Sequence, residues 1–436
     1  LVIGKHSKNM TKAFFFDLQQ KINKGAARPS KEAFPEAKTK KVGILGAGMM
    51  GQGIAFVSAA VGIEVVLLDR DQESAERGKA YSQKLWEKKV SKGRMTKEAM
   101  AEKLALIKAT ASFDDLAGCD MVIEAVFEDR AIKAEATKKT QAVVPKALFC
   151  SNTSTLPISG LSEASNDTKN FIGLHFFSPV DKMPLVEIIM GKDTSDEALA
   201  KAFDYVLQIK KTPIVVNDSR GFFTSRVFGT FTNEGLAMLG EGVSAAMIEN
   251  EARKAGMPVG PLAISDEVSM SLQEHIRQQT IKDLAAEGKQ MPDHPAYAVV
   301  DAMLKEFNRA GKAAGAGFYE YPQGGKKFLW PELKARFEKA DAQISQEDVR
   351  DRILFIQAIE TVRCLEENVL LSVADANIGS IFGIGFAAWT GGALQFINQY
   401  GVKDFVARAQ YLAEQYGERF LPPALLLEKA AKGETF

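Results

Sequence analysis

The segment from Lys41 to Asp69 constrains the fold more than any other part of this sequence. An apolar run leads into a glycine-rich turn, GAGMMG at 46–51; an apolar helical pattern follows, and a second apolar run ends at Asp69. Strand, glycine turn, helix, strand and terminal acid are the parts of a dinucleotide-binding unit. The sequence therefore predicts a nucleotide-binding domain; the alternative is a glycine turn that serves packing alone.

The glycines and the acid of this segment also indicate which dinucleotide would bind. Gly46 permits a tight turn, Gly48 lets a pyrophosphate approach the backbone, and Gly51 lets helix and strand pack closely. The start of the helix offers N–H groups to the phosphates. Asp69, 18 residues after Gly51, would accept hydrogen bonds from a ribose 2′-hydroxyl and would repel a 2′-phosphate. The expected cofactor is NAD rather than NADP.

Composition excludes several other classes of protein. The 436 residues carry 55 basic and 55 acidic side chains, so the overall charge shows no affinity for polyanions and no nucleic acid is expected as a partner. Cys119, Cys150 and Cys364 lie far apart and are typical of buried thiols in a reducing compartment. The four histidines have no metal-ligand spacing, so no metal is predicted.

One stretch is long and uncharged enough to require comparison with a membrane span. Ile378–Ile397 has no charged residue over 20 positions and contains Gly379-xxx-Gly383, which alone would suit a transmembrane helix. Glycines and polar residues interrupt it, and Gly391-Gly392 breaks a helix. We expect a buried helix–turn–helix and no membrane span.

Strand and helix signals divide the chain into regions. Apolar strand candidates alternate with helical patterns as far as Arg220-Gly221, and after that point the pattern is helical. Beyond the first nucleotide-binding segment, the strand candidates are Asp120–Ala125, Ala147–Ser151, Phe171–Phe177, Leu185–Met190 and Pro213–Val216. The expected fold class is α/β, a Rossmann-type doubly wound sheet followed by two related all-α C-terminal units. The expected regions are a linker helix and linker at 1–40, an NAD-binding Rossmann domain at 41–221, and helical domains at 222–340 and 347–436.

An internal repeat supports the two helical domains. Two arginines are each followed by glutamates eight and fifteen residues later: Arg226, Glu234 and Glu241 in the first copy, Arg352, Glu360 and Glu367 in the second. Each copy continues to a glycine-rich turn. Chance spacing between two amphipathic helices is the alternative.

Candidate catalytic residues lie at the ends of three strand candidates. Ser154 follows one strand, His175 lies near the end of another, and Glu187 lies in the next, 12 residues after His175. Strand ends line the ligand crevice of an open α/β sheet. A carboxylate in so apolar a strand needs a partner, and a carboxylate–imidazole pair can remove a hydroxyl proton while hydride leaves the same carbon. Alone, His175 would be read as a core histidine.

Six blocks together resemble the L-3-hydroxyacyl-CoA dehydrogenases, in order and spacing: GAGMMG, EAVFED (124–129), SNTST (151–155), HFFSP (175–179), MPLVEII (183–189) and GFFTSR (221–226). The doubled C-terminal unit resembles the dehydrogenase part of the multifunctional fatty-acid oxidation enzyme, the alpha subunit of the fatty oxidation complex, without its enoyl-CoA hydratase domain. The resemblance implies helical units like the C-terminal domain of 6-phosphogluconate dehydrogenase. It also implies NAD-dependent oxidation of (3S)-3-hydroxyacyl-CoA to 3-ketoacyl-CoA in fatty-acid β-oxidation.

The resemblance assigns a role to each site residue. His175 would be the general base, Glu187 its orienting partner, and Ser154 and Ser225 substrate contacts at the reacting end. Ser225 and Ser178 stand where the family pattern has Asn. Contacts to NAD are implied for Gly46, Gly48, Met50, Gly51, Asp69, Val126, Glu128, Lys133 and Ser178. Ser82 and Lys89 would meet the CoA end, unless that charged helix is simply a solvated surface.

Partners and alternatives follow from the same resemblance. The expected partners are an acyl-CoA thioester substrate, a thiolase subunit in a multienzyme complex, and further copies of the chain in a homo-oligomer. The expected location is the cytoplasm of a bacterium, with the mitochondrion and the peroxisome as alternatives. Two other functions remain open: an NAD-binding protein without catalysis, and a different NAD enzyme acting on free hydroxy acids.

Overall fold

The computed structural model describes residues 4–436 and divides them into two compact units. One, here called the sheet unit, comprises residues 13–224 and 367–383. The other, here called the helical unit, comprises the described residues up to Lys12 together with residues 225–366 and 384–436. The second half of the chain therefore contributes a short segment to the sheet unit, which matters for the site described below.

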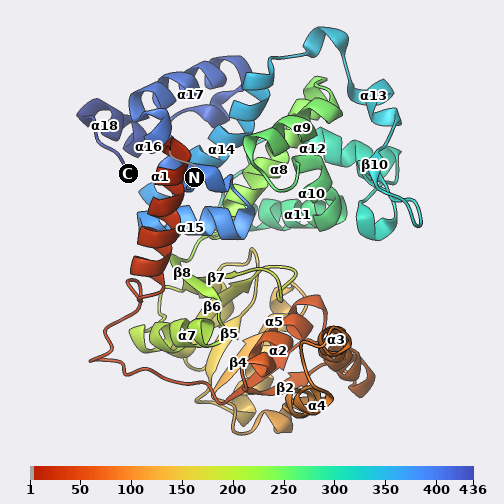
Figure 1. Cartoon of the computed structure of the whole chain (residues 1–436), viewed down its shortest axis with the longest axis vertical. Coiled ribbons are helices and arrows are strands. Elements are labelled where there is room, and N and C mark those ends of the chain that lie inside the picture. Colours follow the sequence, from red (N-terminus) through yellow and green to blue (C-terminus); the bar gives the residue numbers. More distant parts are fainter. Residues whose placement is uncertain (1–3) are drawn as a thin grey trace. The chain divides into compact units, whose positions relative to one another are not determined.

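The sheet unit is built on eight strands in the order β3-β2-β1-β4-β5-β6-β7-β8 (Figure 1). Every neighbouring pair is parallel except β6 and β7, which are antiparallel. The first six strands have the Rossmann order, which confirms the predicted doubly wound sheet. The strands are β1 (Lys41–Leu45), β2 (Glu64–Leu68), β3 (Ile107–Thr110), β4 (Met121–Glu124), β5 (Leu148–Ser151), β6 (Phe171–Phe176), β7 (Leu185–Met190) and β8 (Thr212–Asn217).

Helices lie between most consecutive strands, as a doubly wound topology requires, whereas a loop joins the antiparallel strands β6 and β7. The helical stretch between β2 and β3 is interrupted, because α3 ends at Ser91 and α4 starts at Lys97. The connecting helices are α2 (Met49–Ala60), α3 (Gln72–Ser91), α4 (Lys97–Ala105), α5 (Arg130–Val143), α6 (Ile158–Ser162) and α7 (Asp196–Gln208). Before the sheet, α1 (Lys5–Thr11) continues into the π-helix η1 (Lys12–Ile22).

Strand alternation decides which face of the sheet each site residue occupies. Leu174 and Phe176 of β6 and Val186 and Ile188 of β7 point into the core beneath α2 and α7, where Ser58 and Tyr205 also share a hydrogen bond of 2.8 Å. The residues between them must point to the opposite face. In the antiparallel register of β6 and β7, His175 stands directly across from Glu187. Both site residues therefore project from the same face of the sheet.

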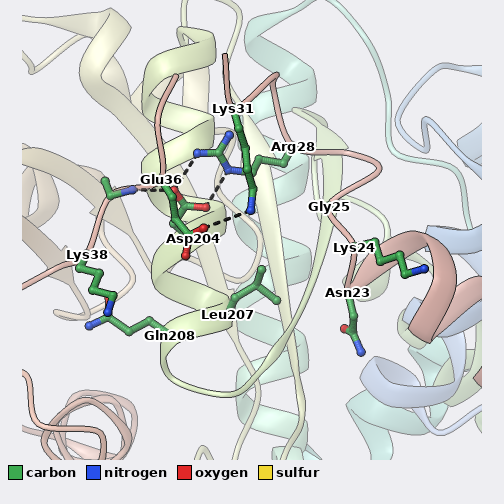
Figure 2. A pocket seen from close by; sticks show the side chains of 11 residues that line it. Asn23, Lys24, Gly25, Arg28, Lys31, Glu36, Lys38, Asp204, Leu207 and Gln208 are labelled. Atoms are coloured by element: carbon green, nitrogen blue, oxygen red, sulfur yellow. Dashed lines mark hydrogen bonds and ion pairs between the residues drawn. The ribbon is translucent and has the colours of Figure 1, made fainter. Parts of the chain in front are cut away.

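The segment predicted to be a linker is fastened to the sheet unit. Residues 25–40 have no helix or strand, and the Arg28 guanidinium, almost fully buried, makes two hydrogen bonds to Asp204 of α7, at 2.7 and 2.8 Å (Figure 2). The backbone N–H of Ala37 donates to the same carboxylate at 3.0 Å. The pairing with Asp204 raises the pKa of Arg28 above its usual value. This segment is therefore ordered by specific contacts.

A segment from far along the chain covers the outer edge of β8. Asn217 donates its backbone N–H to Val369 O at 2.9 Å and its side-chain amide to Asn368 O at 2.8 Å. The N–H of Val215 donates to the Asp375 carboxylate, at 3.0 Å, at the start of α15 (Val373–Ile384). An open strand edge exposes unpaired backbone groups, and this segment satisfies them.

The helical unit confirms the all-α prediction, with one addition, the two-residue strands β9 (Tyr319–Glu320) and β10 (Phe328–Leu329). Its longer helices are α8 (Thr224–Glu241), α9 (Ala245–Ala255), α10 (Pro261–Val268), α11 (Met270–Ala286), α14 (Gln346–Glu366), α16 (Ala393–Tyr400), α17 (Val402–Tyr416) and α18 (Ala424–Lys432). Shorter ones are α12 (Ala296–Asp301) and α13 (Glu332–Phe337).

The charged residues of the internal repeat pair with one another between its two copies. Arg352 of the second copy contacts Glu234 and Glu241 of the first, each at 2.7 Å. Arg226 of the first copy contacts Glu360 of the second at 2.9 Å. This reciprocal exchange supports the interpretation of 8- and 15-residue spacings as a true repeat.

The uncharged stretch Ile378–Ile397 forms helical segments separated by a glycine turn, as predicted. It contains the end of α15, a short 3₁₀ turn and the start of α16. None of the helices in the described part of the chain has the length and apolar character needed to cross a bilayer.

Candidate active site

The glycine turn after β1 has the shape that a dinucleotide pyrophosphate needs. Gly46 has φ +92°, and a Cβ there would lie 2.5 Å from the carbonyl oxygen of Ala125. A Cβ on Gly51 would lie 1.7 Å from the carbonyl oxygen of Gly46. A Cβ on Gly48 would meet nothing within 4 Å, and α2 starts after Gly48 without a side-chain cap. The turn thus leaves open space in front of uncapped helix N–H groups, which fits a bound NAD.

Asp69 lies beside this turn at the end of β2. One carboxylate oxygen accepts a hydrogen bond of 2.7 Å from the N–H of Ala47, and the other accepts one of 2.7 Å from Arg70. These bonds fix the carboxylate next to the residues that would hold the pyrophosphate. Met50, the second residue of α2, is half-buried and packs against the core.

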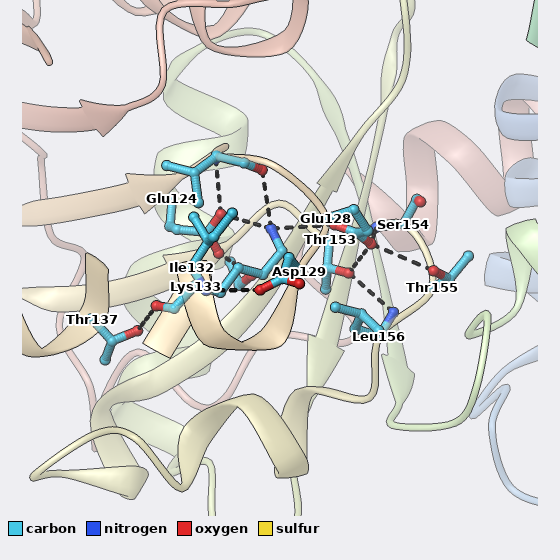
Figure 3. A network of polar contacts seen from close by, with 12 residues as sticks. Glu124, Glu128, Asp129, Ile132, Lys133, Thr137, Thr153, Ser154, Thr155 and Leu156 are labelled. Carbon is cyan, nitrogen blue, oxygen red and sulfur yellow. Dashed lines mark hydrogen bonds and ion pairs between the residues drawn. The ribbon is translucent and has the colours of Figure 1, made fainter. Parts of the chain in front are cut away.

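Lys133 of α5 is a buried cation held by two carboxylates (Figure 3). Its Nζ lies 2.7 Å from Glu124 and 3.2 Å from Glu128, and it also donates to the carbonyl oxygen of Val126 at 3.3 Å. Glu124 also accepts hydrogen bonds from the Val126 N–H and the Ser151 hydroxyl. Because the Lys133 ammonium is engaged in these contacts, its role is to position and neutralise the Glu124 and Glu128 carboxylates.

Glu128 connects this cation to the loop that carries Ser154 (Figure 3). Its carboxylate accepts a hydrogen bond of 3.1 Å from the backbone N–H of Ser154 and another from the Thr153 hydroxyl. Burial acts to raise the pKa of Glu128, but Lys133 and these donors outweigh it, and the net pKa lies below the usual value. The ionised carboxylate therefore ties the Ser154 loop to α5.

His175 and Glu187 are in direct contact. The His175 Nδ1 lies 2.9 Å from a carboxylate oxygen of Glu187, which is 0% exposed. A carboxylate only accepts hydrogen bonds, so with Glu187 ionised the ring proton is on Nδ1 and the lone pair is on Nε2. The ring of Phe177 packs on the imidazole with centroids 4.5 Å apart.

Three further donors surround the Glu187 carboxylate, all from residues just after β8. The Thr224 hydroxyl donates at 2.6 Å, and the backbone N–H groups of Phe223 and Thr224 donate at 3.0 and 3.1 Å. Thr224 is also the first residue of α8, whose N-terminal end carries partial positive charge. These contacts compensate the buried charge without a lysine or arginine.

The remaining site candidates lie in different surroundings. Ser178 is exposed, with its hydroxyl 3.6 Å from the sulfur of Met49. On α3, Ser82 is fully buried, whereas Lys89 is exposed with its ammonium over the ring of Phe56, 5.6 Å from the centroid. Ser225 belongs to the helical unit. The structure therefore joins His175 to Glu187 and Ser154 to Glu128.

Sequence reasoning missed two residues that hold these groups in place, Thr224 and Glu124. Both had a usable signal. Thr224 stands where a helical pattern begins, a position at which a threonine hydroxyl commonly binds a nearby group. Glu124 is an acid at the end of an apolar strand, the same argument that drew attention to Glu187.

Comparison with known proteins shows which family this chain resembles. Residues 41–219 match the NAD-binding domain of 3-hydroxyacyl-CoA dehydrogenase, and residues 221–321 match its C-terminal domain. The fatty acid oxidation complex subunit alpha of Pseudomonas paraeruginosa is 38% identical over 408 residues, covering 91% of this chain and 56% of that protein. The subunit of the same name from Vibrio vulnificus is 34% identical over 439 residues, covering 100% and 60%. The chain thus spans a little over half the length of these relatives.

Solved structures agree with the family match. (S)-3-hydroxybutyryl-CoA dehydrogenase from Ralstonia eutropha is 32% identical, with a TM-score of 0.60 over 65% of this chain and 100% of that protein. The 3-hydroxybutyryl-CoA dehydrogenase of Escherichia coli has a TM-score of 0.77 over 91% of this chain and 99% of that one; at 22% identity it shows the fold alone. The predicted cofactor is confirmed as NAD, and the chain belongs to the 3-hydroxyacyl-CoA dehydrogenase family of NAD-dependent oxidoreductases.

Proposed function

We propose that this chain oxidises (3S)-3-hydroxyacyl-CoA to 3-ketoacyl-CoA in fatty-acid β-oxidation. The contact between His175 and Glu187 is the observation that carries the proposal, because it supplies an oriented base in a domain whose cofactor is NAD. The names of the relatives, which include fatty acid oxidation and 3-hydroxybutyryl-CoA dehydrogenase, support the substrate class.

The reaction divides between the base and the cofactor. The free Nε2 of His175 removes the proton of the substrate 3-hydroxyl, and Glu187 stabilises the imidazolium that forms. Bound NAD would supply the hydride acceptor, so that the hydrogen on C3 would leave with both electrons of the C–H bond and the carbon–oxygen bond would become a carbonyl. Ser154 donates a hydrogen bond to the substrate oxygen, and Ser225 contacts the substrate at the same end.

The geometry of the turn and of the Lys133 network supports the cofactor contacts that we propose. Gly46, Gly48, Met50 and Gly51 hold the pyrophosphate, and Asp69 binds the adenosine ribose. The contacts that we propose on the nicotinamide side of the cofactor are Val126, Glu128, Lys133 and Ser178. Among them, Glu128 contacts the ribose, and Lys133 positions the Glu128 carboxylate. On α3, Lys89 and Ser82 remain our candidates for the CoA end: Lys89 is exposed there, whereas the buried Ser82 would reach CoA only after a local movement of its neighbours.

Other features of the whole protein are proposals of the same kind. We propose domain boundaries at 41–221, 222–340 and 347–436 after the linker at 1–40, a cytoplasmic location, and assembly with a thiolase subunit and with further copies of the chain. The word complex in the names of the curated relatives supports an assembly of several subunits.

The substitution His175→Ala tests the function directly. Loss of a general base lowers turnover by about 10² to 10⁴, whereas NADH binding, measured by fluorescence, should stay unchanged. Turnover is followed by NADH absorbance with acetoacetyl-CoA. His275→Ala, at an exposed histidine of α11, is the matched control and should retain full activity.

Two results would contradict the proposal. A His175→Ala variant that keeps more than about half of the wild-type turnover would show that another group is the base. Equal turnover of acetoacetate and acetoacetyl-CoA would indicate a dehydrogenase of free hydroxy acids instead.

A further inference from the structure

The helix α15 packs against the residues that surround Glu187, although it lies far along the chain from them. Two of its glycines make the closest approach. A Cβ on Gly379 would lie 2.8 Å from Ile214 Cδ1 and 2.9 Å from Phe223 Cε1. A Cβ on Gly383 would lie 2.8 Å from Leu185 Cδ2 and 3.1 Å from Thr224 Cγ2. A side chain at either position would therefore require these neighbours to move.

The neighbours of these glycines are the groups that hold the catalytic pair. Phe223 and Thr224 together supply three of the four hydrogen bonds that Glu187 accepts. Phe177, whose ring packs on His175, would lie 3.4 Å from a Cβ on Gly383. The surface of α15 that carries the two glycines therefore lies directly behind the donors to the Glu187 carboxylate.

Backbone conformation does not explain the glycines. Neither has the left-handed φ that favours glycine, and both lie inside a helix, where alanine is the better residue. Small residues at such positions allow one backbone to approach another closely. The close packing itself is thus what glycine provides at 379 and 383.

We propose that Gly379 and Gly383 are positioning residues for the His175–Glu187 pair. By admitting no side chain, they let α15 press the Phe223–Thr224 turn against β7, so that its N–H and hydroxyl groups reach the Glu187 carboxylate. The second half of the chain thereby supports the catalytic base, a role that rests on the proposed function of His175.

The test is Gly383→Ala in the full chain, assayed with acetoacetyl-CoA and NADH. The new methyl group crowds the side chains of Leu185 and Thr224, and we expect kcat to fall by about 10- to 100-fold, the effect of a small misplacement at a reacting centre. The KM for acetoacetyl-CoA and the Kd for NADH should stay within about twofold, because neither depends on the base. Should this variant not fold, Gly379→Ala makes the same test through Phe223.

Two further variants separate positioning from general damage. Gly229→Ala makes the same change on α8, where a Cβ would meet nothing within 4 Å, and kcat should stay within about twofold of wild type. Thr224→Ser removes the methyl group that the new Cβ would crowd and keeps the hydroxyl. The double variant Gly383→Ala with Thr224→Ser should therefore regain at least part of the kcat lost by Gly383→Ala.

Hydrogen–deuterium exchange gives a readout that is independent of activity. The amides of Phe223 and Thr224 donate to a buried carboxylate, so residues 221–226 should exchange faster in Gly383→Ala than in wild type or Gly229→Ala. A folded Gly383→Ala variant with wild-type kcat and wild-type exchange would overturn the inference while His175→Ala remained inactive. Retained activity in His175→Ala would instead overturn the proposed function.

Discussion

Replacing Asp375 by asparagine should stabilise the sheet unit in a pH-dependent way. Asp375 is 3% exposed at the start of α15, where its carboxylate accepts the Val215 N–H at 3.0 Å. Burial raises the pKa of this group from 3.8 to about 6, against the opposing effect of the hydrogen bonds from Val215 and Ser372. The negative charge of Asp17 acts in the same direction as burial. The ionised form is therefore costly in the fold.

The sign and size of the effect follow from linkage between protonation and folding. The folded state binds the proton more tightly than the unfolded state, so the contribution to stability is fully present below pH 3.8 and is lost as the pH rises to about 6. A difference of about 2 pKa units corresponds to about 3 kcal/mol in the free energy of unfolding. Asparagine does not ionise, and its carbonyl oxygen can still accept the Val215 N–H.

Urea unfolding of wild type and Asp375→Asn at several pH values measures this difference. At pH 7.5 the variant should be more stable by about 1 to 3 kcal/mol, the lower figure allowing for imperfect placement of the amide. The advantage should shrink between pH 6 and pH 4, the interval between the two pKa values. An advantage of equal size at all pH values, or a variant less stable at pH 7.5, would refute the reasoning.

Two other substitutions probe the cofactor site and the internal repeat. Asp69→Ala should weaken NAD binding and reduce the preference for NAD over NADP, measured as the ratio of kcat/KM for the two cofactors. Equal kcat/KM of the wild type with both cofactors would contradict the role of Asp69. Arg352→Met should lower the free energy of unfolding of the helical unit by about 3 kcal/mol, because it leaves the fully buried Glu234 with only part of its compensating charge. Arg350→Met removes a partly exposed arginine from Glu251, which keeps Lys254 at 2.7 Å, and should cost less than about 1 kcal/mol. Equal losses in the two variants would show that burial of the arginine is unimportant.

Much of the sheet was predictable from the sequence, but the direction of β7 was not. The strand from Leu185 to Met190 has the predicted bounds, because its apolar run is bordered by Pro184 and Gly191. An apolar run reads the same in a parallel and an antiparallel sheet, so periodicity could not show that β7 runs against β6. The direction matters because it sets His175 directly across from Glu187.

The contact between His175 and Glu187 was predictable from the residue types, but the residues that support this contact were not. A carboxylate in an apolar strand requires a partner, which is enough to select Glu187 and His175 from the sequence. The burial of Lys133 and the placement of α15 behind Thr224 depend on contacts between residues distant in sequence. Local sequence patterns carry no information about such contacts. From the sequence alone, the spacing of the α15 glycines resembled that of packed membrane helices.

The turn that carries the Glu187 donors contains the clearest backbone strain near the site. Phe222 is a fully buried aromatic residue with φ +53°, a conformation that costs a bulky side chain about 1 to 3 kcal/mol. A relaxed turn would aim the next two N–H groups elsewhere. As it is, the N–H groups of Phe223 and Thr224 both point at one carboxylate oxygen of Glu187. The strained turn thus supplies two of the hydrogen bonds that hold the Glu187 carboxylate beside His175, and the role that we propose for α15 is to keep the turn in this conformation.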